Sequence, residues 1–317
     1  MKILVTGAAG FIGSKLMQEL KERGEAVVGI DNFDAYYDPA LKQARVQAFG
    51  LEVLPGDVTD KASLDALFAR EAFDTVVHLA AQAGVRHSIE QPYAYLDSNL
   101  AGFLNVLEAC RHYGVKHLFF ASSSSVYGDH VEGASREDDP TDCPVSLYAA
   151  TKKGDELMAH AYSRLYGITT TGLRLFSVYG PWGRPDMAPM LFAKAICAGE
   201  TIPVFNHGEM WRDFTYIDDV VEGILRLMSR SGGLAPASHA IYNIGSAHPV
   251  KLTDFIDALE QSLGRTTAKQ YLPMQPGDVC RTAADITRLE RETGFRPHIS
   301  LGEGIARFAE WYKAYVL

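Results

Sequence analysis

A tyrosine and a lysine stand four residues apart in the segment Tyr148-Ala-Ala-Thr-Lys152. If this segment is helical, positions i and i+4 share one face, so the lysine ammonium lies beside the tyrosine hydroxyl. A phenol ionises in water only at about pH 10, and a neighbouring cation favours its phenolate form. The pair therefore has the chemistry of a base that removes a proton from an alcohol. Taken alone, this spacing is common by chance and is better explained by a solvent-facing helix; its place after the βα units and the serines below favours the catalytic interpretation.

Four consecutive serines, Ser122 to Ser125, follow a predicted strand over residues 117–121. A hydroxyl at the carboxyl end of a parallel strand can hydrogen-bond a substrate oxygen and share its proton. Loop serines also bond their own backbone in ST-turns. We expect at least one of the four to do only that.

Three glycines, Gly7, Gly10 and Gly13, connect a predicted strand over 3–5 to a predicted helix over 13–23. Glycine lets backbone N–H groups approach a pyrophosphate, and the helix amino terminus adds partial positive charge. Asp31 ends the second strand, where a carboxylate accepts the ribose hydroxyls of NAD and repels the 2′-phosphate of NADP. The alternative is a tight turn with a helix-capping aspartate.

Further cofactor contacts are expected around these residues and at the ends of the third and fourth strands. Asp57 taken alone is as well explained as a turn residue, and the small residues after the fourth strand are as well explained by close packing. The additional candidates are Phe11, Ile12, Asn32, Asp57, Val58, Leu79, Ala80 and Ala81.

Apolar runs and amphipathic stretches alternate through the first half of the chain, which indicates an α/β fold with a doubly wound parallel sheet covered on both faces. After residue 176, glycine and proline become frequent and indicate a smaller, loop-rich domain. We expect a dinucleotide-binding domain over 1–175, to which 214–246 returns, and an interleaved substrate-binding domain over 176–317. The predicted strands cover 3–5, 26–30, 52–54, 75–79, 117–121, 169–175 and 241–244, and the predicted helices 13–23, 62–70, 99–113, 148–166 and 218–228.

Composition excludes several function classes. The 317 residues are 47% hydrophobic and carry a net charge of −9, which is typical of a globular protein and disfavours a nucleic-acid partner. We expect no membrane span, because no apolar run approaches about 18 residues. The four widely spaced cysteines predict reduced thiols in a cytoplasmic protein, and no Cys/His spacing predicts a metal site.

Several segments together resemble the extended short-chain dehydrogenase/reductase family. They are TGAAGFIG, Asp31, ASSSSVYG, YAATK, LAAQAGVRHS, SNLAGFLNVLEACR, RLFSVYGPWGRPDM, VFNHGEMWRDFTYIDDVVEGI and MQPGDV. The resemblance covers nearly the whole chain and is strongest to nucleotide-sugar 4-epimerases that act on UDP-glucuronate. It implies a Rossmann fold, NAD as a bound cofactor, a homodimer, and conversion of UDP-glucuronate to UDP-galacturonate through a transient 4-keto sugar.

The resemblance also implies residue roles. Tyr148 corresponds to the catalytic base, Lys152 to its partner, which also holds the nicotinamide ribose, and Ser123 to the catalytic Ser/Thr. Arg212 corresponds to the arginine that grips the UDP pyrophosphate, and Asp278 to the acidic residue near the uridine ribose. Arg86 and Arg184 are weaker anion contacts, each as well explained as a surface or structural arginine.

Related activities differ at a few of these positions. Dehydratases carry Asp-Glu and decarboxylases a Glu after the catalytic hydroxyl, where this chain has Ser124 and Ser125. Ser177 stands where UDP-galactose epimerases usually have Asn and glucuronate epimerases Thr. These hydroxyls favour a glucuronate substrate whose carboxylate they hold; the alternative is UDP-galactose or UDP-N-acetylglucosamine 4-epimerisation. Cys280, Arg281 and Ala284 depart from the usual pattern near the uridine.

Overall fold

The computed structural model describes residues 1–129, 133–230 and 237–316. The chain folds into two compact units. Unit 1 comprises 1–128, 140–174 and 224–242, and unit 2 comprises 129–139, 175–223 and 243–317. The chain therefore passes between the units several times.

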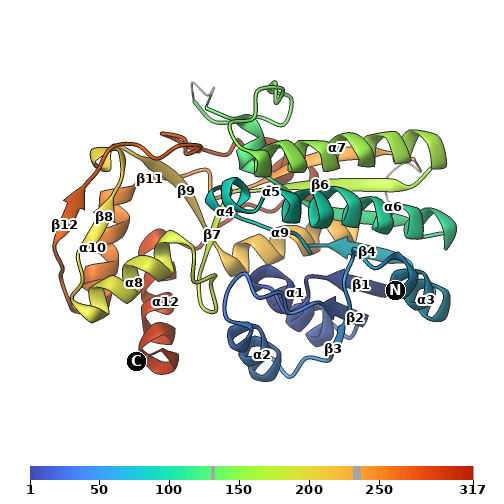
Figure 1. The fold of residues 1–317 in the computed structure, drawn as a ribbon, viewed down its shortest axis with the longest axis horizontal. Coiled ribbons are helices and arrows are strands. Elements are labelled where there is room, and N and C mark those ends of the chain that lie inside the picture. The colour runs from blue at the N-terminus through green and yellow to red at the C-terminus, as the bar shows by residue number, and fades with distance from the viewer. Residues whose placement is uncertain (130–132, 231–236, 317) are drawn as a thin grey trace. The chain divides into compact units, whose positions relative to one another are not determined.

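Unit 1 is built on a mostly parallel sheet of seven strands in the order β10-β6-β5-β4-β1-β2-β3 (Figure 1). Pairing is parallel between β1 and both β2 and β4, between β2 and β3, and between β4 and β5. The order reverses at β1, as in a doubly wound sheet. The strands are β1 (Lys2–Thr6), β2 (Ala26–Asp31), β3 (Val53–Pro55), β4 (Thr75–His78), β5 (His117–Ser123), β6 (Thr169–Leu175) and β10 (His239–Ile244).

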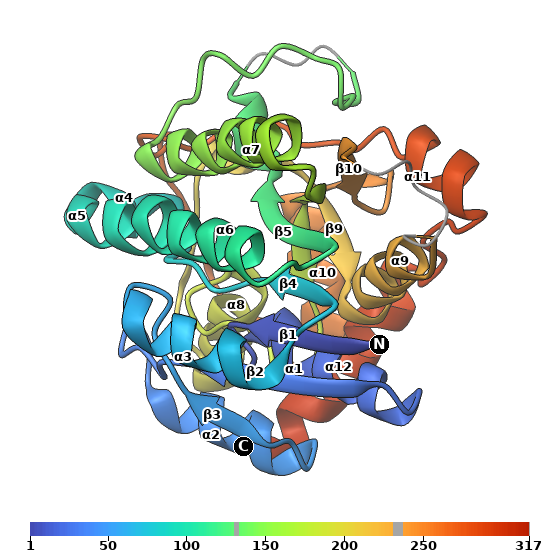
Figure 2. The ribbon, with the colours of Figure 1, turned by 90° about the vertical axis from the view of Figure 1, so that its right-hand side faces the viewer.

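Helices cover both faces of this sheet. Figure 2 shows α3, α6 and α7 along one face, where α6 packs against both α3 and α7. α1 and the part of α9 that belongs to unit 1 lie along the other face. The helices of this unit are α1 (Phe11–Glu22), α2 (Pro39–Ala48), α3 (Lys61–Glu71), α4 (Val85–Glu90), α5 (Pro92–Tyr95), α6 (Gly102–His112) and α7 (Leu147–Tyr166), with α9 (Ile217–Arg230) shared with unit 2.

The core lies between the sheet and its helices. Strand residues on both faces are buried, as the continuous apolar runs predict for a covered parallel sheet. Leu4, Val76 and Leu118 are fully buried beside Phe103 and Val106 of α6. The sheet is therefore a rigid base from which the strand ends project.

Unit 2 contains two small sheets and a group of helices. β9 (Trp211–Tyr216) pairs in parallel with β7 (Ser177–Tyr179) and antiparallel with β11 (Pro249–Lys251). β8 (Ile202–Val204) pairs in parallel with β12 (Lys269–Tyr271). α10 packs against α8 and α12. The helices are α8 (Ala188–Ala198), α10 (Leu252–Leu263), α11 (Thr287–Thr293) and α12 (Leu301–Tyr315).

Among the described residues, no helix has the length and apolar character that a membrane crossing requires.

Burial of His117 at the start of β5 gives the fold a pH dependence. Its ring bonds Thr171 at 2.8 Å, and burial lowers its pKa to about 4 from 6.5. Between about pH 6.5 and about pH 4, the His117 ring is therefore neutral in the folded chain but protonated in the unfolded chain. The free energy of unfolding is therefore at its full value above about pH 6.5 and decreases as the pH falls towards about 4.

We expect this group to lower the free energy of unfolding by about 3 kcal/mol over that pH range. His117→Gln, whose amide can still bond Thr171, should flatten the slope in urea titrations run from about pH 7 to about pH 4. The exposed His112→Gln is the matched control. An unchanged slope in His117→Gln would contradict the assignment.

Candidate active site

The turn after β1 requires its glycines. Gly7 has φ of +69°, and a Cβ there would lie 2.7 Å from the backbone nitrogen of Ala80. A Cβ at Gly13 would collide with the carbonyl oxygen of Gly7. α1 begins at Phe11 directly behind this turn. The absent side chains leave a backbone cradle at a helix amino terminus, which suits a pyrophosphate.

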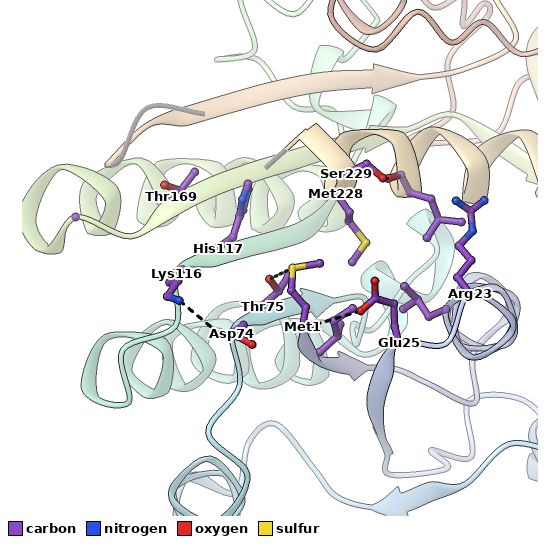
Figure 3. A pocket seen from close by; sticks show the side chains of 14 residues that line it. Met1, Arg23, Glu25, Asp74, Thr75, Lys116, His117, Thr169, Met228 and Ser229 are labelled. Carbon is purple, nitrogen blue, oxygen red and sulfur yellow. Dashed lines mark hydrogen bonds and ion pairs between the residues drawn. The ribbon is translucent and has the colours of Figure 1, made fainter. Parts of the chain in front are cut away.

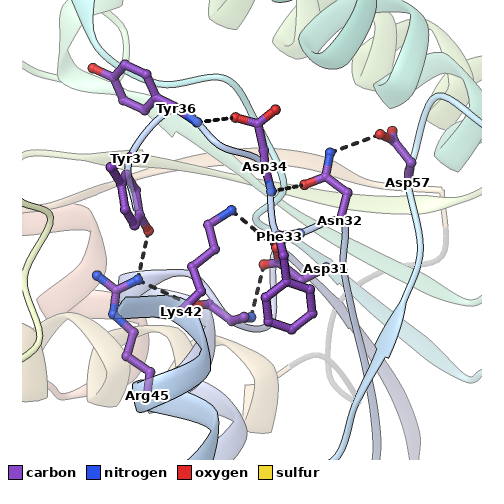
Figure 4. A network of polar contacts seen from close by, with 10 residues as sticks. Asp31, Asn32, Phe33, Asp34, Tyr36, Tyr37, Lys42, Arg45 and Asp57 are labelled. Carbon is purple, nitrogen blue, oxygen red and sulfur yellow. Dashed lines mark hydrogen bonds and ion pairs between the residues drawn. The ribbon is translucent and has the colours of Figure 1, made fainter. Parts of the chain in front are cut away.

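Asp31 at the end of β2 is tied to this turn (Figure 4). Its Oδ2 accepts a hydrogen bond from Ala9 N at 3.0 Å, and its Oδ1 accepts from Phe33 N at 2.8 Å. Lys42 Nζ donates to the same Oδ1 at 3.3 Å. The carboxylate is thus fixed at the carboxyl end of the strand next to β1, where a cofactor ribose binds in doubly wound folds.

Two buried cations stand beside Asp31 that the sequence analysis did not single out. Lys42 and Arg45 both lie on α2, which was not predicted. Arg45 donates to Ala9 O at 3.2 Å and to Tyr37 Oη at 2.7 Å (Figure 4). The available signal was Asp38-Pro39, because an aspartate cap followed by proline is typical of a helix start.

Asp57 stands just after β3 and faces the end of β2. Asn32 Nδ2 donates to its Oδ2 at 2.9 Å. Burial raises the pKa of Asp57, but hydrogen bonds from Asn32 and Thr59 outweigh that effect and leave the pKa below its usual value. Val58 is buried beneath it against Gly102. Asn32 and Asp57 are therefore held as a pair.

The segment after β4, which contains Leu79, Ala80 and Ala81, lies against the glycine turn. Ala80 N donates to Thr6 Oγ1 at 3.2 Å. The next residues are held by Asn99, whose Oδ1 accepts from Gln82 N at 2.8 Å. Asn99 Nδ2 also donates to Thr151 Oγ1 at 3.0 Å. Asn99 thus connects the end of β4 to the helix of the candidate base.

Asn99 is another residue that the sequence analysis missed. It is fully buried and lies in a π-helical turn, η1 (Leu96–Ala101), which precedes α6. The periodicity had predicted one continuous helix over 99–113. π-turns frequently occur at functional sites because they redirect side chains within a helix.

Tyr148 and Lys152 both lie in α7, as predicted. Ser146 caps the helix by accepting from Ala149 N at 3.1 Å. The Tyr148 ring is half-buried and stands 6.1 Å from the Tyr95 ring, edge to face. Lys152 is buried, one turn further along. The Tyr148 side chain is thus neither fully buried in the core nor fully exposed to solvent.

The serines divide into different roles. Ser122 Oγ donates to Glu156 at 2.6 Å, inside the core. Ser123 is the last residue of β5, and its Oγ accepts from Ser125 N at 3.2 Å, an ST-turn contact. Ser124 and Ser125 are half-buried at the start of η2 (Ser124–Tyr127). The strand therefore extends two residues beyond the predicted end.

Unit 2 brings Arg212 and Asp278 together. The guanidinium Nη2 of Arg212, on β9, donates to Asp278 Oδ1 at 2.6 Å. Ser177 lies on β7, where it pairs in register with Phe214 of β9. Arg184 bonds Asp186 through two nitrogens, at 3.0 and 2.5 Å. Arg86 is an exposed residue of α4 in unit 1.

A separate hollow of about 770 Å³ lies at the opposite edge of the sheet in unit 1 (Figure 3). It is bounded by residues at the amino ends of the strands, among them Ile3, Thr75 and His117. None of the predicted site residues lines it. Ligands of doubly wound sheets bind outside the carboxyl ends of the strands, so this hollow is not the candidate site.

The sheet order and the glycine cradle define a dinucleotide-binding protein. Residues 3–245 match the NAD dependent epimerase/dehydratase family, and the chain belongs to that family. It is 46% identical to UDP-glucuronate 4-epimerase 4 of Arabidopsis thaliana, over 99% of this chain and 75% of that protein. It is 45% identical to a probable UDP-glucuronate 4-epimerase of Rhizobium meliloti, over 98% of this chain and 97% of that protein.

The fold is also similar to that of a solved relative. A UDP-glucuronic acid 4-epimerase from Bacillus cereus, in complex with UDP-glucuronic acid and NAD, superposes with a TM-score of 0.92. The two are 35% identical, and the match covers 99% of each chain. The predicted Rossmann fold and the predicted family are confirmed.

Proposed function

We propose that this protein is an NAD-dependent nucleotide-sugar 4-epimerase that interconverts UDP-glucuronate and UDP-galacturonate. The observation that carries the proposal is the placement of a half-buried Tyr148 and a buried Lys152 on one helix of a unit that also holds a pyrophosphate cradle. The relatives named UDP-glucuronate 4-epimerase, which match nearly the whole chain, support the substrate.

The proposed NAD site consists of the glycine turn and the strand ends beside it. Gly7 and Gly13 leave room for the pyrophosphate, and Asp31 accepts the adenosine ribose hydroxyls. NAD⁺, when bound, supplies the oxidising and reducing chemistry at C4 of the sugar. The other proposed contacts are Gly10, Phe11, Ile12, Asn32, Asp57, Val58, Leu79, Ala80, Ala81, Tyr148 and Lys152.

Tyr148 is the proposed base. Its phenolic oxygen takes the proton of the sugar 4-hydroxyl as the 4-keto sugar forms and returns it when the opposite stereoisomer is made. Lys152 favours the phenolate by its charge. Ser123 bonds the same sugar oxygen. Arg212 holds the pyrophosphate through its planar guanidinium while the keto sugar turns, and Asp278 lies by the uridine ribose.

A glucuronate substrate adds a hazard, because a 4-keto sugar with a C6 carboxylate is a β-keto acid and can lose CO₂. We propose that the hydroxyls of Ser124, Ser125 and Ser177 hold the carboxylate where the breaking bond cannot align with the carbonyl. Hydroxyls do this without supplying an acid that would assist the loss. Arg86 and Arg184 are further proposed anion contacts.

The test is incubation with UDP-glucuronate without added reductant, followed by product identification. The expected product is UDP-galacturonate, with no net consumption of NAD⁺. Parallel incubations with UDP-glucose and UDP-N-acetylglucosamine test the alternative substrates. A UDP-pentose as main product, or turnover of the neutral sugars alone, would overturn the proposal.

We further propose that the protein is a cytoplasmic homodimer. Within each chain, we propose that residues 1–175, to which 214–246 returns, bind the cofactor, and that the rest of 176–317 binds the nucleotide sugar. Exposed apolar side chains on two neighbouring helices support the dimer: Leu104 on α6, and Leu157 and Leu165 on α7. The exposed free thiols Cys143 and Cys280 are typical of a reducing compartment. Sedimentation of the purified protein tests the dimer.

A further inference from the structure

The buried face of α7 carries charged residues where an amphipathic helix normally carries apolar ones. Lys152 and Asp155 are one turn apart, and their side chains are 2% and 1% exposed. Lys152 Nζ donates to Asp155 Oδ2 at 3.1 Å. Replacing a buried ion pair with apolar residues often leaves stability unchanged or raises it, so such a pair is weak evidence for a stabilising role.

The pair is incompletely satisfied. Asp155 Oδ1 is buried and has no hydrogen-bond partner in the part of the chain that the structure describes. An ammonium has three donors, and Asp155 takes one of them. The carboxylate thus fixes one side of Lys152 and leaves two N–H groups for other acceptors.

The other charged or titratable groups near Lys152 either pair with groups other than Lys152 or are neutral. Glu156, the next residue on α7, bonds Ser122 of β5 and Arg174 of β6, and Lys153 stands 3.7 Å from it. On β4, burial and the charge of Lys152 lower the pKa of His78 to about 3, so this ring is neutral at physiological pH.

The remaining elements packed against α7 carry groups that pair elsewhere or face solvent. On α4, His87 stands 3.8 Å from Glu90, and Arg86 is exposed. On η1, Asp97 is exposed. On α6, Glu108 bonds Arg111, His112 and Tyr162. Tyr95 of α5 donates to Ala83 O and Gly84 O. Asp155 is therefore the described anion that directly opposes Lys152.

We propose that Asp155 is a positioning residue for Lys152: it holds the ammonium in place and partly cancels its charge, which sets the pH at which Tyr148 becomes a phenolate. The inference rests on the proposed role of Tyr148 as the base. Tyr148, Lys152 and Asp155 follow at i, i+4 and i+7, so all three lie along one stripe of the helix. Lys152 therefore lies one helical turn from Tyr148 on one side and one turn from Asp155 on the other.

The ionisation state of Asp155 fits this role. Burial raises its pKa to about 6, while the charge and hydrogen bond of Lys152 oppose that rise. Above about pH 6 the Asp155 carboxyl is ionised, so its negative charge offsets the positive charge of the Lys152 ammonium. The phenol of Tyr148 then feels less positive charge than Lys152 alone would provide. Replacing Asp155 with an uncharged residue of the same shape should therefore let Tyr148 ionise at lower pH.

The test separates charge from placement with two variants. Asp155→Asn keeps an oxygen that can accept from Lys152, but removes the negative charge. Asp155→Ala removes the acceptor as well. Glu90→Gln, an exposed carboxylate on the neighbouring α4, is the matched control for the change in net charge.

The first readout does not depend on turnover. The ultraviolet absorbance of tyrosinate is titrated with and without an added Tyr148→Phe change, and the difference reports Tyr148. We expect its midpoint to fall by about one pH unit in Asp155→Asn, from a charge change within one to two helical turns, and to stay unchanged in Glu90→Gln. An unchanged or higher midpoint in Asp155→Asn would overturn the proposal.

The second readout is the pH profile of kcat/KM for UDP-glucuronate. We expect its acid limb to move to lower pH in Asp155→Asn, and kcat to fall roughly tenfold or more in Asp155→Ala, since general-base catalysis contributes at least that much, with KM little changed. Wild-type kcat and profile in Asp155→Ala would overturn the proposal. A shifted midpoint without epimerase activity in the wild-type chain would instead overturn the proposed function and leave the inference standing.

Discussion

Tyr148→Phe is expected to lower kcat for UDP-glucuronate epimerisation by about 10²-fold or more, because general-base catalysis typically contributes that much. The change removes a single oxygen from a half-buried ring on α7. Tyr148 packs edge to face against Tyr95, and phenylalanine can make the same contact. The fold and the bound NAD should therefore remain. The measurement is the initial rate of UDP-galacturonate formation, together with the NAD content of the purified variant.

The matched control is Tyr166→Phe, at the other end of the same helix. Its ring packs under the guanidinium of Arg111, a contact that does not need the hydroxyl. This variant should keep wild-type activity. Tyr148→Phe with activity within a few-fold of wild type, and with normal NAD content, would remove Tyr148 from the role of base.

The elements that position this tyrosine follow from local sequence patterns. The continuous apolar runs of β1, β4 and β5 are buried on both faces, and that is the pattern of a covered parallel sheet. The start of α7 was predictable from Ser146, which caps it, and its end from Gly167, which takes the left-handed conformation. Local sequence patterns therefore predicted the sheet and α7 closely.

Other elements depend on tertiary contacts that the periodicity of the sequence cannot predict. The π-turn around Asn99 forms where one buried amide bonds both Gln82 and Thr151, which are far apart in the sequence. Residues 129–139 group with unit 2, although the chain on both sides of them belongs to unit 1 and the sequence analysis placed all of 1–175 in one domain. Such features arise from tertiary packing, which overrides local propensity.

The residues of the candidate site could be singled out from the sequence where chemistry restricts the residue type. Only glycine fits at Gly7, and a carboxylate at the end of β2 suits ribose hydroxyls. Lys42 and Asp155 were missed because lysine and aspartate are common on helix surfaces, and the sequence does not show that these two are buried. Burial gives these two charges their significance, and burial is a property of the fold.

Gly13→Ala is expected to weaken the binding of NAD roughly 10²-fold while leaving a folded chain. A Cβ at this position collides with the carbonyl oxygen of Gly7 and comes within 2.9 Å of its carbonyl carbon. Both atoms are backbone, so relief requires the turn itself to move away from α1. Displacing the turn removes the N–H groups that face the pyrophosphate. A loss of about 3 kcal/mol of binding corresponds to a roughly 10²-fold higher Kd.

The measurement is the Kd for NAD⁺ by titration calorimetry on protein freed of bound cofactor, with circular dichroism to check the fold. Gly302→Ala on α12 is the matched control, because a Cβ there meets nothing within 4 Å and the position does not need positive φ. That variant should bind NAD⁺ as the wild type does, since alanine is favoured within a helix. If Gly13→Ala also binds NAD⁺ with wild-type affinity, the pyrophosphate does not lie in this turn, and the cofactor site must be sought elsewhere along the strand ends.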